Sequence, residues 1–243
     1  MKPIDYPIRI NRYLYLKGYC SRRKADSFIE KGFVTINGKR AEVGAKVFAH
    51  DKVVVAKEMT ALPRSYKYFM YNKPVGIVSH NPQKDEEGVE DVSGLSKDFV
   101  SVGRLDKASH GLMLLSNDGR IVDRMLNPKF EHEKEYIVKV DKRVTGTFVN
   151  GMSRGVHIEG YRTKPAIVKK TGERTFTIIL TEGKKHQIRR MVAAFGYQVL
   201  DLKRTRIMSI KLGALKEGAT RELSEGQRKK LLDVLNVENP IST

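Results

Sequence analysis

The segment Gly103-Arg104-Leu105-Asp106 decides how the rest of the chain is interpreted, because it places a carboxylate between two predicted strands. Residues 99–102, which precede it, form a short β-branched and aromatic run that is typical of a strand. Residues 110–116, which follow it, predict a second strand that an Asp-Gly turn closes. The carboxylate is therefore expected at a corner of a sheet, with a cationic residue on either side.

Two interpretations of Asp106 are open from this segment alone. A carboxylate between the cations Arg104 and Lys107 has reason to stay ionised, and an ionised, desolvated carboxylate can act as a nucleophile. Alternatively, the aspartate only tightens a turn. Three further segments bear on the choice: residues 71–77 (Tyr-Asn-Lys-Pro-Val-Gly-Ile), 134–136 (Lys-Glu-Tyr) and 180–191 (Leu-Thr-Glu-Gly-Lys-Lys-His-Gln-Ile-Arg-Arg-Met).

In their order and wording, these four segments resemble the pseudouridine synthases of the RsuA/RluB/RluE/RluF branch, which isomerise one uridine in ribosomal RNA. The resemblance extends from about Arg9 to about Leu223. The string at 186–191 and the later Arg-Thr-Arg-Ile-Met at 204–208 look most like the RluF type. The resemblance implies a catalytic domain with a mixed, mainly antiparallel sheet and a cleft across it.

The residue pattern after residue 63 is α+β, because strand-like runs alternate irregularly with helical ones. Further strands are predicted at 66–71, 136–140, 165–168, 174–180 and 197–200. Helices are predicted at 119–126, 185–195 and 224–235, the last with Ser224 as its cap. The acidic stretch at 85–91 is expected to be an exposed loop.

Composition independently indicates a nucleic-acid partner. The 243 residues include 46 Lys and Arg against 28 Asp and Glu, a formal net charge of +18. Enzymes of small metabolites rarely need such an excess of positive charge. In a nucleic-acid-binding protein, by contrast, cationic residues strengthen binding to the phosphate backbone, because counterions are released from it. The single cysteine, Cys20, cannot form an internal disulfide or a cysteine-rich metal site. There is no apolar run of membrane-spanning length and no signal-peptide core, so we expect a cytoplasmic protein without membrane contact.

Residues 1–62 are more basic than the rest and have a pattern of their own. They carry 13 Lys and Arg against 6 Asp and Glu. Helices are predicted from about Ile10 to Gly18 and from Ser21 to Gly32, followed by strands at 34–36 and 52–56 around an Asn-Gly turn.

This N-terminal pattern resembles the S4 RNA-binding domain. We therefore expect an S4-like domain at 1–62 and a pseudouridine synthase domain at 63–243, with residues 58–65 as the linker because Pro63 interrupts regular structure. The helix dipole disfavours cations in the first turn of a helix. The cations in the first turn of the second helix are therefore expected to bind RNA. The RNA-binding candidates here are Arg9, Arg22, Arg23 and Lys24. A basic, solvated helix face is the alternative.

The resemblance also assigns roles within the synthase domain. Asp106 would be the nucleophile that attacks either the sugar or the uracil. Arg189, rather than Arg190, would pair with it and hold it ionised, the alternative being a phosphate contact. Arg104 would fill the stack that the flipped base leaves, or else clamp a phosphate. Tyr136 would face the uracil and shuttle a proton, or else be a core aromatic.

The remaining candidates surround these residues. Leu105, Gln187 and Ile188 are placed at the substrate, Ile188 against one face of the base. His186 is expected to be structural or an RNA contact rather than a general base. Lys73-Pro74-Val75-Gly76 would shape the floor of the cleft. Phosphate contacts are expected from Lys107, Lys184, Lys185, Arg204 and Arg206.

Pseudouridine formation involves no redox change and no net hydrolysis, so we expect neither a cofactor nor a metal. The sequence has no Walker-type loop and no clustered His or Cys ligands. The expected substrate is a uridine in a stem-loop of large-subunit (23S) ribosomal RNA near the peptidyl transferase centre, with a tRNA anticodon loop as a possible second target. We expect a monomer. A non-catalytic RNA-binding protein and a basic hydrolase are the alternative functions.

Overall fold

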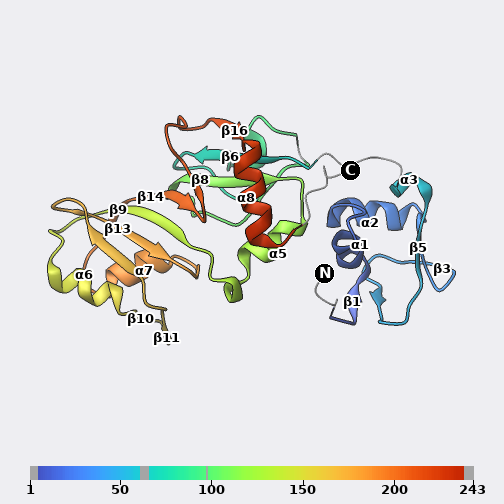
Figure 1. The fold of residues 1–243 in the computed structure, drawn as a ribbon, viewed down its shortest axis with the longest axis horizontal. Coiled ribbons are helices and arrows are strands. Elements are labelled where there is room, and N and C mark those ends of the chain that lie inside the picture. The colour runs from blue at the N-terminus through green and yellow to red at the C-terminus, as the bar shows by residue number, and fades with distance from the viewer. Residues whose placement is uncertain (1–4, 61–65, 97, 238–243) are drawn as a thin grey trace. The chain divides into compact units, whose positions relative to one another are not determined.

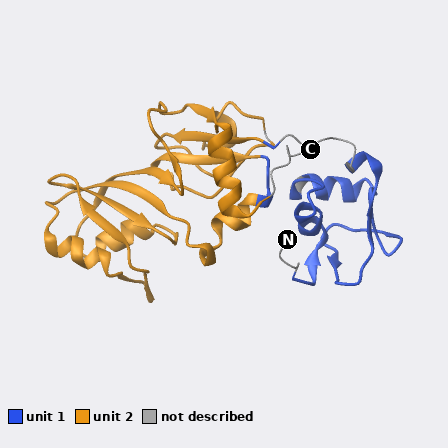
Figure 2. Ribbon diagram, in the orientation of Figure 1, with its two compact units in different colours: residues 1–66, 117–120, 240–243 blue, residues 67–116, 121–239 orange. Residues whose placement is uncertain are grey.

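The computed structural model describes residues 5–60, 66–96 and 98–237, which form two compact units (Figures 1 and 2). The N-terminal unit is built on residues up to Tyr66 together with Asn117–Arg120. The C-terminal unit is built on Lys67–Ser116 and the residues from Ile121 onward. The expected boundary after residue 62 lies outside the described residues and stays a prediction. In the described part of the chain, no helix is long and apolar enough to cross a membrane.

Two short helices begin the N-terminal unit: α1 (Ile10–Leu16) and α2 (Arg22–Glu30). Ser21 caps the N-terminus of α2, because its hydroxyl accepts a hydrogen bond from the backbone N–H of the third helical residue at 3.3 Å. Gly18 and Gly32 follow the two helices with φ of +78° and +79°, the conformation that commonly ends helices at glycine. Both predicted helices are therefore confirmed.

Short strands complete this unit. Strand β2 (Val34–Ile36) lies between β3 (Lys39–Arg40) and β5 (Val53–Val55), antiparallel to both. Asn37 and Gly38 both have positive φ, so they form the predicted tight turn from β2 to β3. A separate antiparallel pair is formed by β1 (Ile8–Arg9) and β4 (Lys46–Val47).

The linker prediction for residues 58–65 is wrong in its first part. Lys57–Thr60 forms helix α3, and Met59 is buried in the core of the N-terminal unit. Pro63 restricts only the residue directly before it, so it does not prevent a helical turn at 57–60. Residues 61–65 lie outside the described residues.

The C-terminal unit is built on one mixed sheet of nine strands. Its main path runs β12-β13-β9-β14-β8-β6-β16, with β15 beside β14 and β7 beside β8 (Figure 1). Its pairings are antiparallel except that between β8 and β14, so the predicted mixed, mainly antiparallel sheet is confirmed. The strands are β6 (Tyr68–Lys73), β7 (Val100–Ser101), β8 (His110–Ser116), β9 (Lys134–Val140), β12 (Ile167–Lys170), β13 (Thr175–Leu180), β14 (Val199–Ile207), β15 (Ile210–Lys211) and β16 (Thr220–Glu222).

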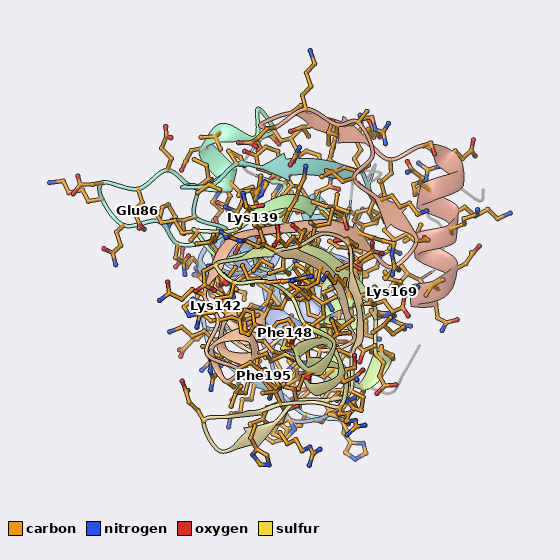
Figure 3. All side chains as sticks on the ribbon, turned by 90° about the vertical axis from the view of Figure 1, so that its left-hand side faces the viewer. Glu86, Lys139, Lys142, Phe148, Lys169 and Phe195 are labelled. Atoms are coloured by element: carbon orange, nitrogen blue, oxygen red, sulfur yellow. The ribbon has the colours of Figure 1, made fainter. Side chains whose placement is uncertain are left out.

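Two helices, α6 (Gly146–Ser153) and α7 (Gln187–Ala193), pack against β9, β13 and β14 in one hydrophobic core of this unit. Phe148 of α6 is fully enclosed there and meets the ring of Phe195 edge-on, with 5.6 Å between centroids (Figure 3). The other elements are α4 (Val89–Val92), α5 (Arg120–Leu126), the 3₁₀ turn η1 (Pro128–Phe130), the hairpin β10 (His157–Ile158) and β11 (Tyr161–Arg162), and α8 (Glu225–Leu235).

Three differences from the sequence-based elements have physical causes. Helix α6 was not predicted, because it is rich in Gly, Thr and Val, which are weak helix formers. The strand expected at 197–200 continues to Ile207 as β14. The acidic stretch at 85–91 is not all loop, since α4 begins at Val89, whose side chain is buried.

The one parallel pairing of the sheet requires a glycine. Strands β8 and β14 are paired through only two residue pairs, His110 with Lys203 and Gly111 with Arg204. Gly111 has φ of +104°, and a Cβ atom there would lie 2.3 Å from the carbonyl oxygen of Arg204. Any side chain at this position would therefore force the two strands apart.

We expect Gly111→Ala to lower the free energy of unfolding by about 2–4 kcal/mol, because the new methyl group collides with backbone that cannot rotate away. The matched control is Gly218→Ala, which also has positive φ (+74°) but no atom within 4 Å of its Cβ position. That variant should lose only about 1–2 kcal/mol, the backbone strain alone. Urea unfolding of the full chain measures both. Equal losses in the two variants would show that the close approach at Gly111 does not matter.

Candidate active site

Asp106 lies on the turn at residues 103–109 that connects β7 to β8, and this turn borders a cavity of about 620 Å³. That volume falls in the range of roughly 300–1,000 Å³ that is usual for ligand pockets. The cavity lies within the C-terminal unit, and its walls come from six segments: 78–80, 102–107, 125–128, 132–136, 180–188 and 202–207.

The backbone of this turn is held by neighbouring segments. The Ser79 hydroxyl accepts a hydrogen bond from the Leu105 N–H at 2.9 Å and donates one to the Leu105 carbonyl. The Gly76 N–H donates to the Lys107 carbonyl at 2.9 Å. Asp106 is thus flanked by two residues whose backbones are fixed. Residues 73–76 are not among those that line the cavity, so their contribution to the floor of the cleft stays a prediction.

The carboxylate of Asp106 itself is left without a hydrogen bond from any described side chain. Its Oδ1 lies 3.7 Å from Nε2 of His186, and 35% of its side chain is exposed. His186 adopts φ of +52° at the start of α7, a left-handed conformation in which histidine, asparagine and aspartate occur more often than other non-glycine residues. A carboxylate on a fixed turn, open toward a cavity, is arranged as a nucleophile or base requires.

The structure places Arg189 differently from the predicted pairing with Asp106. Its guanidinium donates to the Ala108 carbonyl at 2.9 Å, to the Ser109 hydroxyl at 3.3 Å and to the Val199 carbonyl at 3.4 Å. From the first turn of α7, this side chain reaches the far end of the Asp106 turn, where carbonyl oxygens satisfy it. Arg189 therefore fixes the turn rather than the carboxylate, and its contact with substrate stays a prediction.

Two further cations lie buried beneath the turn. Lys73 is fully buried, and its Nζ donates to the carbonyls of Pro74 and Ile77, both at 2.8 Å. Burial, together with the nearby charge of Arg204, lowers the pKa of Lys73 to about 8, although the charge of Asp106 opposes this. A cation that has lost its hydration is thus kept next to the nucleophile candidate.

The expectation that Arg204 and Arg206 contact phosphates is wrong for Arg204 and weakened for Arg206. Arg204 is 3% exposed, and it donates to the carbonyls of Leu112 (2.7 Å) and Arg104 (3.3 Å). Arg206 pairs with Glu135 at 2.8 Å and Glu133 at 2.9 Å, so its charge is already balanced. Sequence alone did not separate these buried or paired arginines from exposed ones.

Three of the residues that the sequence analysis placed at the substrate, Tyr136, Leu105 and Ile188, are among the apolar residues that line the cavity. Tyr136 on β9 is half-buried and packs against two hydrophobic clusters of the C-terminal unit. Leu105 and Ile188 are 7% and 5% exposed. An aromatic ring and two aliphatic side chains beside a carboxylate form a surface that suits a flat base.

A buried carboxylate that the sequence analysis did not single out supports the opposite wall. Glu182 is 5% exposed and accepts hydrogen bonds from the Tyr161 hydroxyl (2.5 Å), the Gln187 amide (2.6 Å) and the Lys164 N–H (3.0 Å). The amide oxygen of Gln187 accepts from the Lys184 N–H at 2.9 Å. The amide nitrogen and the amide oxygen of Gln187 therefore both form hydrogen bonds within the protein. Contact between Gln187 and RNA stays a prediction.

Several of the predicted RNA-binding cations line the rim. The side chain of Arg104 is exposed and has no hydrogen bond or ion pair with a described residue. Lys107 pairs with Glu86 at 2.9 Å, and Glu86 is carried by a loop that projects to one side in Figure 3. Lys184, which also lines the cavity, lies 4.8 Å from the ring centroid of Tyr161. Arg190 is not among the lining residues, and it pairs with Glu159 at 2.6 Å.

In the N-terminal unit, the candidates Arg9, Arg22 and Lys24 all have exposed side chains. The side chain of Arg23 lies outside the described residues. Around both units, the described residues contain no group of three or more His, Cys, Asp or Glu placed to hold a metal ion.

Comparisons with known proteins agree with this geometry. The family model for RNA pseudouridylate synthase matches residues 67–194, and the S4 domain model matches residues 8–53. Dual-specificity RNA pseudouridine synthase RluF of Escherichia coli (strain K12) is 42% identical over 242 residues, covering 98% of this chain and 82% of that protein. Ribosomal large subunit pseudouridine synthase B of Bacillus subtilis (strain 168) is 32% identical over 234 residues, covering 92% of this chain and 95% of that protein.

One solved structure supports the same assignment over nearly the whole chain. A crystal structure of a pseudouridylate synthase matches with a TM-score of 0.69 and 28% identity, covering 92% of this chain and 99% of that one. The family match spans five of the six segments that build the cavity, from β6 to the end of α7, and the sixth, 202–207 on β14, lies beyond it. The chain therefore belongs to the RNA pseudouridylate synthase family and carries an S4 domain ahead of its synthase domain.

Proposed function

We propose that this enzyme converts one uridine to pseudouridine in a stem-loop of large-subunit (23S) ribosomal RNA near the peptidyl transferase centre. The similarity to a large-subunit synthase of Bacillus subtilis supports ribosomal RNA as the substrate. The similarity to a synthase of dual specificity supports a second RNA target, for which a tRNA anticodon loop is the candidate. Small-subunit ribosomal RNA is the alternative that mapping would reveal.

The observation that carries this proposal is the placement of Asp106. Its carboxylate is open to the cavity, while the backbone on both sides of it is held by Ser79 and Gly76. Tyr136, Leu105 and Ile188 form an apolar surface on the same cavity. A base placed there would bring its nucleoside within reach of the carboxylate, and fixed geometry of this kind lowers the barrier to attack.

The chemistry needs no group beyond these residues and the RNA. The bond between N1 and C1′ breaks, C5 joins C1′, the proton on C5 leaves and N1 gains a proton, so electrons and atoms balance. Asp106 holds the reacting fragment by attacking either the sugar or the uracil. We assign the proton transfer at the base to the phenol of Tyr136, which lines the cavity.

The cationic residues help to extrude the uridine from its stack and add affinity for RNA. A uridine within folded RNA must leave its stack, at a cost of roughly a few kcal/mol. The exposed and unpaired Arg104 is suited to replace it, because a planar guanidinium can stack on neighbouring bases. The N-terminal unit adds affinity through Arg9, Arg22 and Lys24. A monomer in the cytoplasm is sufficient for this activity, since the cavity lies within one chain.

The direct test is Asp106→Asn with ribosomal RNA as substrate. This variant keeps the size of the side chain but loses its charge, so pseudouridine formation should fall by at least about 10²–10⁴-fold. Affinity for RNA and thermal stability should be unchanged, as in the control Asp123→Asn on the exposed face of α5. Mass-spectrometric mapping of pseudouridine in the RNA provides the readout. More than about a tenth of the wild-type rate in Asp106→Asn would disprove the assignment of the nucleophile.

The N-terminal cations should contribute affinity and not chemistry. Replacing Arg9, Arg22 and Lys24 together by glutamine should weaken binding and reduce the salt slope of log K by about 2–3, because each phosphate contact contributes roughly 0.7–0.9. The control removes the same charge from exposed lysines of the C-terminal unit, Lys139 and Lys169 (Figure 3) with Lys229. Conversion of a short stem-loop at saturating protein should be unaffected. Equal slopes in both triple variants would contradict RNA binding by the S4 domain.

Arg104 and Arg189 should fail in different ways when each is replaced by lysine. Arg189→Lys loses the planar fork whose two nitrogens reach the three acceptors, so the single-turnover rate should fall equally on paired and unpaired uridines. Arg104→Lys loses a stacking plane, so its defect should shrink on an unpaired uridine, where extrusion costs less. Equal rescue of both variants by the unpaired substrate would contradict the division of roles.

A further inference from the structure

Strand β14 has a local irregularity where it passes the cavity. Its pairing with β9 matches Arg204 with Tyr136 and then Arg206 with Glu135, so Thr205 is an extra residue, a β-bulge. In a regular strand, residues 204 and 206 would share one face of the sheet. The bulge instead directs Arg204 into the cavity wall and Arg206 to its carboxylate partners on β9 and the residue before it.

The side chain that the bulge redirects bridges two parts of the site. Nε of Arg204 donates to the Leu112 carbonyl on β8, and Nη1 donates to the Arg104 carbonyl, two residues before Asp106. One rigid guanidinium thus ties the start of the Asp106 turn to the strand that follows it. A lysine has a single nitrogen and cannot reproduce a planar bridge between two carbonyls.

The surroundings of Arg204 make its burial costly. Its charge adds to burial in lowering the pKa of both Lys73 and Lys134, which shows that three cations share this region. Its third nitrogen, Nη2, is enclosed and has no hydrogen-bond partner among the described residues. Leaving a buried donor unpaired is destabilising, so an arginine placed only for stability would be a poor choice here. Such costs are typical of functional sites.

We propose that Arg204 is a positioning residue of the reaction, whose guanidinium sets the place of Asp106 by holding the Arg104 carbonyl against β8. This inference rests on the proposed function for its catalytic consequence, but the bridge itself is a property of the free protein. It acts at the opposite end of the turn from Arg189, which holds Ala108 and Ser109. The two arginines therefore fix the turn from both ends while the carboxylate between them stays open.

The test compares Arg204→Lys with Arg221→Lys, the same substitution at an exposed arginine of β16 that does not line the cavity. We expect Arg204→Lys to lower the single-turnover rate on the order of 10²-fold, the effect of a misplacement of about 1 Å. Its RNA dissociation constant and salt slope should match wild type, because the charge is retained away from the phosphates. Arg221→Lys should keep both the rate and the affinity of wild type, since this side chain is exposed and lies outside the cavity lining.

Hydrogen–deuterium exchange of the free protein supplies a readout that does not depend on activity. In Arg204→Lys, backbone amides of residues 103–109 should exchange faster, while those of β9 and β13 stay protected. A rate within threefold of wild type would overturn the proposal. So would a weaker RNA affinity with a reduced salt slope, which indicates a phosphate contact, or faster exchange throughout the sheet, which indicates a general structural role. If wild-type protein forms no pseudouridine, the proposed function fails, and the exchange experiment still decides whether Arg204 holds the turn.

Discussion

The site depends on the contact between two strands, β8 and β14, at Gly111 and Arg204. This two-residue parallel pairing joins two groups of antiparallel strands into one sheet. Because Gly111 has no side chain, the backbones approach closely enough for the Arg204 side chain to reach the carbonyls on either side of the Asp106 turn. The same residues therefore pair β8 with β14 and hold the turn that carries Asp106. A change in the strand pairing would alter the turn, and a change in the turn would alter the pairing.

The division between fixed backbone and open side chain explains how a small turn can position a nucleophile. Residues on both sides of Asp106 are held by neutral donors and acceptors, which restrain position without neutralising charge. The buried cations Lys73 and Arg204 bond carbonyl oxygens instead of the carboxylate. A carboxylate bonded directly by these groups would be stabilised in its resting state and would be a weaker nucleophile.

The sequence predicted what is set by local patterns. Ser21 and Ser224 begin helices as expected because capping requires only a hydroxyl near the first turn. The bulge at Thr205 could not be predicted, since it depends on the register between β14 and β9. For the same reason, the burial of Arg204 was missed. Glu182 was also overlooked, because its three donors come from segments that are distant in the sequence or make no recognisable motif.

Three arginines of this enzyme illustrate why charge alone does not assign a role. Arg104, Arg189 and Arg204 all act on or within the same turn, yet only Arg104 is exposed and unpaired among the described residues. The other two direct their donors to carbonyl oxygens of the protein, so their charges serve geometry rather than phosphate binding. The net charge of +18 therefore overstates the cations available to RNA. Its excess attracts the substrate at long range, whereas the buried arginines determine where the carboxylate meets it.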